Sequence, residues 1–302
     1  MDSKTLLIVS IILALFLSSC SGYSSNTKTT SVTDFHTGTE GLYMRFLPET
    51  PPTKIYSNSP LEVMVEYANH GAYPISDGRL YLSGYDNRYI SIDSNTPKYI
   101  NAEAKSVFNP YGKLTNTETF STSAVQLPTD VDRVTQTIKA TACYDYKTEA
   151  SIEVCIDPKT TDTLRESVCQ VQTSYGGGSQ GAPLAVTSVE EEIYNDKVQF
   201  RIYLSNVGGG TVMKEGKIDN CHTSLNRDDA NKVWVESVEF AGKTMSCQPT
   251  NYITLDNSGN GFVYCYYQGD LGTDAYKTML QIKLRYAYRS SIQQDIEILK
   301  AP

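Results

Sequence analysis

The chain has 302 residues, a formal net charge of −8, 22 tyrosines, 8 phenylalanines and 7 cysteines. Tyrosine is abundant and the apolar residues recur in short alternating runs, which favours strands over helices and predicts an all-β protein. The acidic balance, with no basic stripe, argues against binding to a phosphate backbone, so nucleic acid is not an expected partner. The length is enough for two domains of ordinary size.

Residues 1–19 have the pattern of an export signal. A lysine precedes an apolar run from Leu6 to Leu17, and two serines lead into Cys20, as in a secretory signal that ends in small residues. The ending resembles the lipobox of prokaryotic lipoproteins, which implies cleavage before Cys20 and a membrane anchor carried on its thiol. Ordinary cleavage nearby, or an uncleaved helix, stays open, because about fifteen apolar-leaning residues are marginal for spanning a bilayer.

Residues 20–40 follow as a tether. Ser and Thr dominate this stretch and apolar residues are almost absent before Phe35. Such a segment cannot bury enough surface to fold, so we expect it to be flexible.

The second half of the chain repeats the first. Residues 198–208 match residues 61–71 position by position, and both stretches alternate and then end in Asn-x-Gly. The segment Tyr286 to Ser290 likewise matches Tyr144 to Thr148. Two tandem copies are predicted, at 41–158 and 183–302, joined by a linker at 159–182. Their length suits β-sandwiches of the immunoglobulin type.

Near the end of the first copy the even-numbered residues 138–146 are expected to face the core. A hairpin reversing near residue 149 would then lead into a final strand at 152–156. That hairpin would place Cys143 opposite Cys155, so we expect a disulfide between them. At the matching positions of the second copy stand Arg285 and Glu297, for which the same geometry predicts a cross-strand salt bridge.

The remaining cysteines also suit disulfides, because six is an even number once Cys20 is set aside. Three lie in each half, so full pairing needs at least one bridge between the halves. Of the three pairings open to the other four, we favour Cys247 with Cys265 and Cys169 with Cys221. Zinc is not expected, since no Cys-x-x-Cys spacing occurs.

The alternating strands that end in Asn-x-Gly, at Val65 to Gly71 and Ile202 to Gly208, resemble the first core strand of cell-adhesion-related (CARDB-like) domains of prokaryotic surface proteins. The Tyr-x-Tyr-basic-hydroxyl segments, with Gly181-Ala-Pro183 before the second copy, are similar to uncharacterised archaeal envelope proteins with tandem immunoglobulin-like modules. The resemblance implies adhesion, spacer or assembly units without a catalytic set. The cysteine content departs from the simplest modules of this kind.

Two motifs suggest chemistry and are explained more simply. Gly177 to Gly181 satisfies the Gly-x-Ser-x-Gly pattern of a hydrolase, but the buried strand and the helix that such an elbow needs are not expected around it. The three histidines, His36, His70 and His222, are scattered, so no catalytic triad is predicted. Asp256 to Gly261 resembles the start of a calcium loop, yet Tyr267 stands where a glutamate is needed, which favours a hairpin turn.

An acidic group at the junction of the copies is the remaining metal candidate. Asp157, Asp162 and Glu190 to Glu192 would have to meet there to bind calcium. A solvated acidic surface is the simpler interpretation, so no metal or cofactor is predicted.

The aromatic residues supply the candidate contact surface. Exposed tyrosines commonly anchor protein or glycan contacts, and the richest patch in the sequence comprises Tyr264, Tyr266, Tyr267 and Tyr276. Trp234 lies in an alternating strand and is expected in the core.

The sequence therefore predicts a lipid-anchored, extracytoplasmic protein at the cell surface that binds a protein or an envelope polysaccharide without catalysis. The alternative is an accessory subunit that braces a membrane protein complex. Two tandem copies do not fix an oligomeric state.

Overall fold

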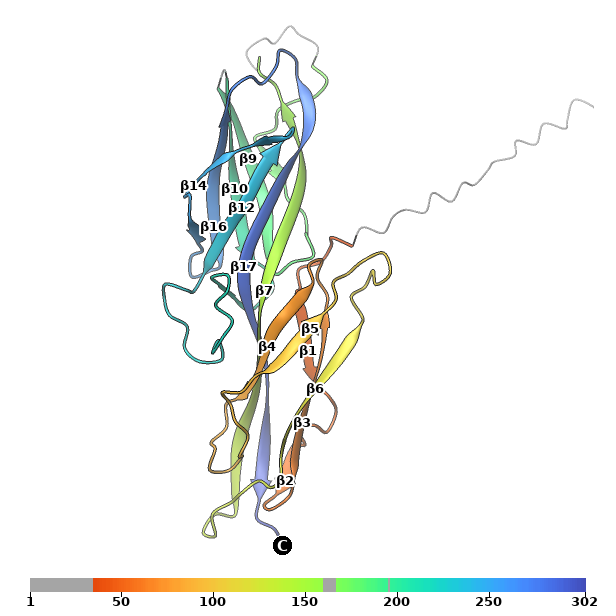
Figure 1. Ribbon diagram of the computed structural model, residues 1–302, viewed down its shortest axis with the longest axis vertical. Coiled ribbons are helices and arrows are strands. Elements are labelled where there is room, and N and C mark those ends of the chain that lie inside the picture. The colour runs from red at the N-terminus through yellow and green to blue at the C-terminus, as the bar shows by residue number, and fades with distance from the viewer. Residues whose placement is uncertain (1–34, 160–166, 195) are drawn as a thin grey trace, which may run out of the picture. The chain divides into compact units, whose positions relative to one another are not determined.

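The computed structural model describes residues 35–159, 167–194 and 196–302 (Figure 1). No helix occurs in these ranges, and the protein is all-β, as the sequence predicted. The expected signal, the lipidated Cys20 and the tether before Phe35 lie outside the described residues.

The strands form three sheets. The first sheet has the order β1 (Leu42–Phe46), β3 (Leu61–Asn69), β6 (Thr115–Thr122). The second has the order β14 (Ser246–Gln248), β16 (Asn260–Gln268), β10 (Lys197–Asn206), β9 (Leu184–Tyr194), β8 (Ser174–Gly176). The third has the order β13 (Lys243–Thr244), β12 (Lys232–Phe240), β17 (Tyr276–Leu299), β7 (Arg133–Ile156), β4 (Ile75–Ser83), β5 (Lys98–Ala102). Beside this path, β11 (Thr211–Met213) and β2 (Lys54–Tyr56) pair with β17, and β15 (Tyr252–Thr254) pairs with β12.

The two longest strands, β7 and β17, run side by side in Figure 1 and pair antiparallel along their whole length of 24 residues each. The hairpin expected near residue 149 is therefore wrong. The even-numbered residues of β7 stay buried from Ile138 to Ile156, and no Gly, Pro or Asn interrupts the alternation between them. A strand that lacks turn residues and keeps one apolar face has no reason to reverse.

This pairing places strands of both sequence repeats in one sheet. β7 belongs to the first repeat and pairs with β4 of the same repeat on one side and with β17 of the second repeat on the other. β17 in turn pairs with β12 and, near its end, with β2. The boundaries proposed for two immunoglobulin-like modules stay a prediction, whereas the shared sheet is what the structure shows.

Four buried tyrosines lie on the paired middle parts of β7 and β17. In the register, Tyr144 is opposite Tyr288 and Tyr146 is opposite Tyr286, and all four are at most 1% exposed. Their ring centroids are 5.6–6.4 Å apart, in edge-on and tilted arrangements that suit aromatic quadrupoles. The matching Tyr-x-Tyr segments of the two repeats thus form one aromatic cluster in the core.

The hydroxyls of these tyrosines make matching hydrogen bonds in the two repeats. Tyr144 accepts one from the Leu42 backbone N–H at 3.0 Å, and Tyr286 accepts one from the Leu184 N–H at 3.4 Å. Tyr146 donates to Asn69 Oδ1 at 3.2 Å, and Tyr288 donates to Asn206 Oδ1 at 3.0 Å. Each asparagine is the Asn of an Asn-x-Gly turn, so these turns are fixed by a tyrosine from the central strands.

The cysteine pairing corrects part of the prediction. The structure joins Cys143 to Cys221 and Cys155 to Cys169, so the expected Cys143–Cys155 and Cys169–Cys221 bridges are wrong. Residues 143 and 155 lie on one continuous strand, about 40 Å apart at 3.3 Å per residue, and cannot be bridged. The Cys247–Cys265 bridge is confirmed. One bridge joins the two halves, as the odd cysteine count in each half required.

The salt bridge expected between Arg285 and Glu297 is also absent from the structure, for the same reason. Arg285 pairs instead with Glu236 and, at 3.3 Å, with Glu215. Glu297 lies near the C-terminal end of β17, where the Lys54 ammonium is 3.6 Å from its carboxylate.

Candidate functional site

The structure separates the four tyrosines of the candidate contact surface. Tyr264 and Tyr266 point outward from β16, the strand on which Val263 and Cys265 are buried. Tyr267 faces the core side and meets the ring of Phe240 edge-on, with centroids 5.5 Å apart. Tyr276 is half-buried at the start of β17 and packs against the core. Only the first two can contribute to a contact surface.

Those two tyrosines belong to a larger patch on the outward side of β9, β10 and β16, which we call the outer aromatic face. It comprises Glu190, Glu192, Gln199, Arg201, Tyr203, Phe262, Tyr264 and Tyr266. β10 is the middle strand, so its outward residues have a neighbour on each side. Arg201 lies between Glu190 and Tyr264, and Gln199 lies between Glu192 and Tyr266.

Arg201 is the centre of this face. Its guanidinium carbon lies 4.4 Å from the ring centroid of Phe262, and the centroids of Tyr203 and Tyr264 are 4.9 and 5.3 Å away. All three distances are within the range of a cation–π attraction. The Nε atom is buried and has no hydrogen-bond partner among the described residues. The chain holds this guanidinium in place with rings and leaves part of its donor capacity unused.

Carboxylates border the aromatic rings. The Tyr203 hydroxyl donates to Glu190 at 2.9 Å, and the Arg201 guanidinium lies 3.9 Å from the same carboxylate. The Tyr194 hydroxyl donates to Glu192 at 2.8 Å. These bonds restrict the side chains before any partner arrives, which lowers the conformational entropy lost on binding.

The side chains enclose a shallow hollow of about 330 Å³, lined by Glu190, Glu192, Gln199, Arg201 and Tyr264. Aromatic surface, one guanidinium, two carboxylates and an amide meet there. Such a mixture can stack on an apolar face of a ligand and hydrogen-bond its polar edges at the same time.

Sequence reasoning missed Arg201, Tyr203 and Phe262, although a signal for them was present. The predicted strand 198–208 alternates, so Gln199, Arg201 and Tyr203 share its outward face. The density of tyrosines alone does not indicate the face of the strand on which each one lies.

Glu191 lies on the opposite side of β9 from this face. Its side chain is 6% exposed, and neither carboxylate oxygen has a hydrogen-bond partner in the described part of the chain. Burial raises the pKa of Glu191 to about 7, and the nearby Tyr175 hydroxyl opposes that rise. The acidic group proposed for calcium is thus divided, since consecutive glutamates point to opposite faces.

The other metal candidates are also accounted for locally. Asp256 caps a turn, accepting from the N–H groups of Ser258 at 2.8 Å and Asn260 at 2.9 Å, so the turn is confirmed. It is not a hairpin, because β15 before it pairs with β12 whereas β16 after it pairs with β10 and β14. Asp162 is outside the described residues. Within the described ranges, no group of three His, Cys, Asp or Glu side chains is arranged to hold a metal ion.

Ser179, the serine of the Gly-x-Ser-x-Gly pattern, lies on an exposed loop and accepts a hydrogen bond from the Gly38 N–H at 3.2 Å. The three-residue strand β8 precedes the loop and β9 follows it, so the strand–turn–helix context of a nucleophile elbow is missing from this described segment. His36, expected in the tether, lines the same hollow as Ser179 and Glu149. No pattern in the sequence indicates that proximity.

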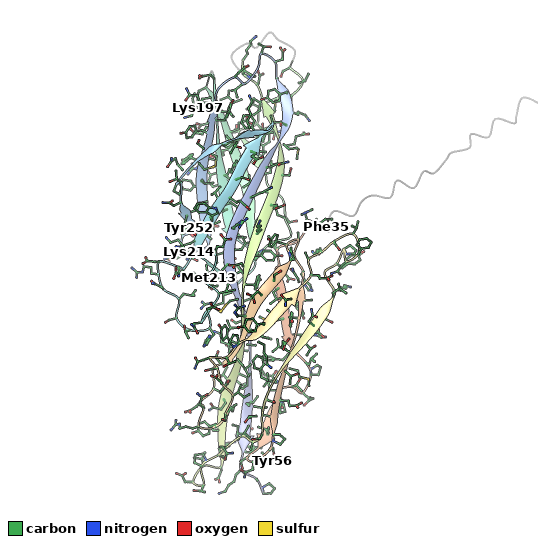
Figure 2. The ribbon with its side chains drawn as sticks, in the orientation of Figure 1. Phe35, Tyr56, Lys197, Met213, Lys214 and Tyr252 are labelled. Atoms are coloured by element: carbon green, nitrogen blue, oxygen red, sulfur yellow. A yellow bond between two sulfur atoms is a disulfide. The ribbon has the colours of Figure 1, made fainter. Side chains whose placement is uncertain are left out.

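Trp234 is half-buried rather than fully in the core, and its ring lies 5.4 Å from that of Tyr252. Figure 2 labels Tyr252 and, close to it, Lys214, whose ammonium is 4.9 Å from the Tyr252 centroid.

Among the residues that the structure describes, no helix is long and apolar enough to cross a membrane. Models of known protein families do not match the chain, and a search of curated proteins finds no relative.

Proposed function

We propose that this protein is a lipid-anchored, extracytoplasmic binding protein that holds a protein or polysaccharide of the cell envelope on its outer aromatic face, without catalysis. Three disulfides indicate an oxidising compartment, which supports an extracytoplasmic location. The lipid anchor at Cys20 is part of the proposal.

The observation that carries the proposal is the placement of Arg201 among three aromatic rings. Arginine and tyrosine are the side chains that most often dominate the binding energy of an interface. Here they lie on the middle of a five-stranded sheet and are fixed by Glu190 and by each other. A guanidinium that is held rigidly, partly removed from water and surrounded by flat rings is suited to contacting a partner.

The test measures binding of the purified full chain to isolated envelope of the source organism, before and after digestion of its protein or its polysaccharide. Arg201→Ala combined with Tyr264→Ser should weaken binding by at least about 30-fold, since a single interface anchor contributes roughly 2 kcal/mol or more and the contributions of neighbouring side chains are not additive. The digestion that abolishes binding of the unmodified chain identifies the class of partner.

The first repeat supplies a matched control. Met64 and Thr119 lie opposite each other on β3 and β6, as Arg201 and Tyr264 do on β10 and β16. Met64→Ala with Thr119→Ala should leave envelope binding unchanged. Equal binding by both double variants would refute the outer aromatic face as the contact surface. Recovery of one stoichiometric membrane protein, unaffected by either variant, would favour the bracing role instead.

A further inference from the structure

The loop between β5 and β6 carries a group of exposed apolar side chains. Val107, Phe108, Tyr111 and Leu114 are 62%, 97%, 70% and 53% exposed, and they fall within eight consecutive residues. We call these four side chains the apolar tip. Single exposed apolar residues are ordinary, but a cluster on one protruding loop marks a contact with something apolar.

The apolar tip is held by a hydrogen-bonded turn. Ser106 and Asn109 exchange backbone hydrogen bonds of 3.1 and 3.0 Å. The Asn109 side chain accepts from the Lys113 N–H at 3.0 Å. Gly112 has a φ of +63°, and a Cβ there would lie 2.4 Å from the Asn69 carbonyl oxygen, so this position needs glycine. The turn therefore holds Phe108 in an outward position, although its side chain packs against almost nothing there.

The base of this loop lies beside the point where the N-terminal segment reaches the folded part. The Lys105 ammonium donates to the Thr37 carbonyl oxygen at 2.8 Å, and the Lys105 N–H donates to the Gly71 carbonyl at 2.9 Å. In Figure 1 the loop lies near the start of the coloured chain, and Figure 2 labels Phe35 there. Fourteen residues lie between Cys20 and Phe35, and these fifteen Cα-to-Cα steps reach at most about 50 Å. A lipid on Cys20 would therefore bring the apolar tip within reach of the bilayer.

From this placement we infer that the apolar tip inserts into the lipid surface that holds the anchor; the inference rests on the lipid anchor of the proposed function. The tip combines aromatic and aliphatic side chains with Lys105 before it and Lys113 within it, a mixture that suits the interface between acyl chains and headgroups. One small turn offers far less area than a stable protein interface needs, about 800 Å² per partner. A weak contact of this kind becomes effective when the anchor makes it intramolecular.

The test uses the full chain, recovered with its N-terminal modification, and vesicles of phosphatidylcholine and phosphatidylglycerol with brominated acyl chains. Trp234→Phe removes the only tryptophan, and Phe108→Trp then reports on the apolar tip. Insertion at an interfacial depth of about 5–10 Å should shift the indole emission to the blue and allow the brominated chains to quench it. The control, Tyr56→Trp in the same background, should show neither change. Tyr56 ends β2 and comes shortly before the start of β3, whereas Gly71 follows the end of β3. The Tyr56 side chain is 52% exposed.

Retention of the chain by the vesicles reports on the anchor, and quenching reports on the apolar tip, so the two can fail separately. Quenching is read at saturating lipid whether or not the chain is retained. A retained chain without quenching at position 108 overturns the inference and leaves the anchor standing. Quenching in a chain that is not retained supports the tip and removes the anchor. A blue shift that grows with protein concentration in the absence of vesicles would assign the tip to a second copy of this chain and overturn the inference.

Discussion

The two smaller sheets are built from matching strands of the two repeats, yet they present different outer faces. β10 and β16 carry Arg201, Tyr203, Phe262, Tyr264 and Tyr266 outward. On the matching strands β3 and β6, the outward positions hold Met64, Glu66, Thr117, Thr119 and Ser121. The first sheet is complete without an arginine surrounded by rings, so the fold does not require one. The outer aromatic face is an addition made by the second repeat.

A second difference lies in the strands that pair with β3 and β10, namely β1 and β9. β1 pairs with β3 only as far as Phe46, whereas β9 continues alongside β10 to Tyr194. The extra length carries Glu190 and Glu192 on the outer side and Glu191 on the inner side. Both repeats contribute tyrosines to the core, whereas only the second repeat has the acidic extension of β9.

The largest expected effect tests the shared core. Tyr144→Ala and Tyr286→Ala each remove a fully buried ring and a hydroxyl that accepts a backbone hydrogen bond. We expect each to lower the free energy of unfolding by about 3–5 kcal/mol, the range for deletion of a large core ring. Denaturant unfolding of the two variants measures this. A large loss in one repeat and a negligible loss in the other would show that the two halves of the cluster are not equivalent.

The next effect concerns the one disulfide that joins the repeats. Cys143→Ala with Cys221→Ala opens a bridge that closes 78 residues, and we expect a loss of about 2–4 kcal/mol. Cys247→Ala with Cys265→Ala is the matched control, because that bridge closes only 18 residues and should cost about 1 kcal/mol less. Thermal unfolding under non-reducing conditions compares them, and the larger loss in the control would contradict the pairing.

The smallest effect comes from the acidic extension. Because burial raises the pKa of Glu191 from 4.5 to about 7, the folded state holds a proton that the unfolded state has already released between these values. The stability should therefore fall as the pH rises from about 4.5 to about 7, by at most roughly 3–4 kcal/mol at about 1.4 kcal/mol per pKa unit. Glu191→Gln should remove this dependence and exceed the unmodified protein in stability at pH 8. Denaturant unfolding across this pH range measures the difference. Glu192→Gln, which faces outward, should leave the pH profile unchanged.

Alternation was the part of the fold that the sequence predicted well. It assigned the even-numbered residues 138–146 to the core, and the structure buries Ile138, Ala140, Ala142, Tyr144 and Tyr146. It also identified both Tyr-x-Tyr segments, though not that their hydroxyls hold the Asn-x-Gly turns. The pairing of β7 with β17 was out of reach, because period-2 alternation specifies a face and not a partner strand.

The errors in cysteine pairing followed from that gap. A hairpin near residue 149 would make Cys143 a neighbour of Cys155. Because that hairpin does not form, the pairing inferred for Cys169 and Cys221 followed from a wrong pair. Cys221 approaches Cys143 through a loop whose position depends on the second repeat, about which local sequence carries no information. The same gap affects the candidate site. Tyr264 and Tyr266 can be identified from the sequence, but Arg201, which lies opposite Tyr264 on the neighbouring strand, cannot be placed there without the strand pairing.

The pairing of β2 with the end of β17 has a consequence for the order in which the chain can fold. Ile55 is aligned with Ile298, and the Ser57 hydroxyl accepts a hydrogen bond from the N–H of Ala301, 244 residues later. At about 5–20 residues per second, a ribosome needs roughly 12–50 s to make the intervening chain. The first repeat therefore waits, with β2 unpaired, until the end of β17 has been synthesised. Removal of the end of β17 should expose Ile55, because β2 and the end of β17 pair in the same sheet.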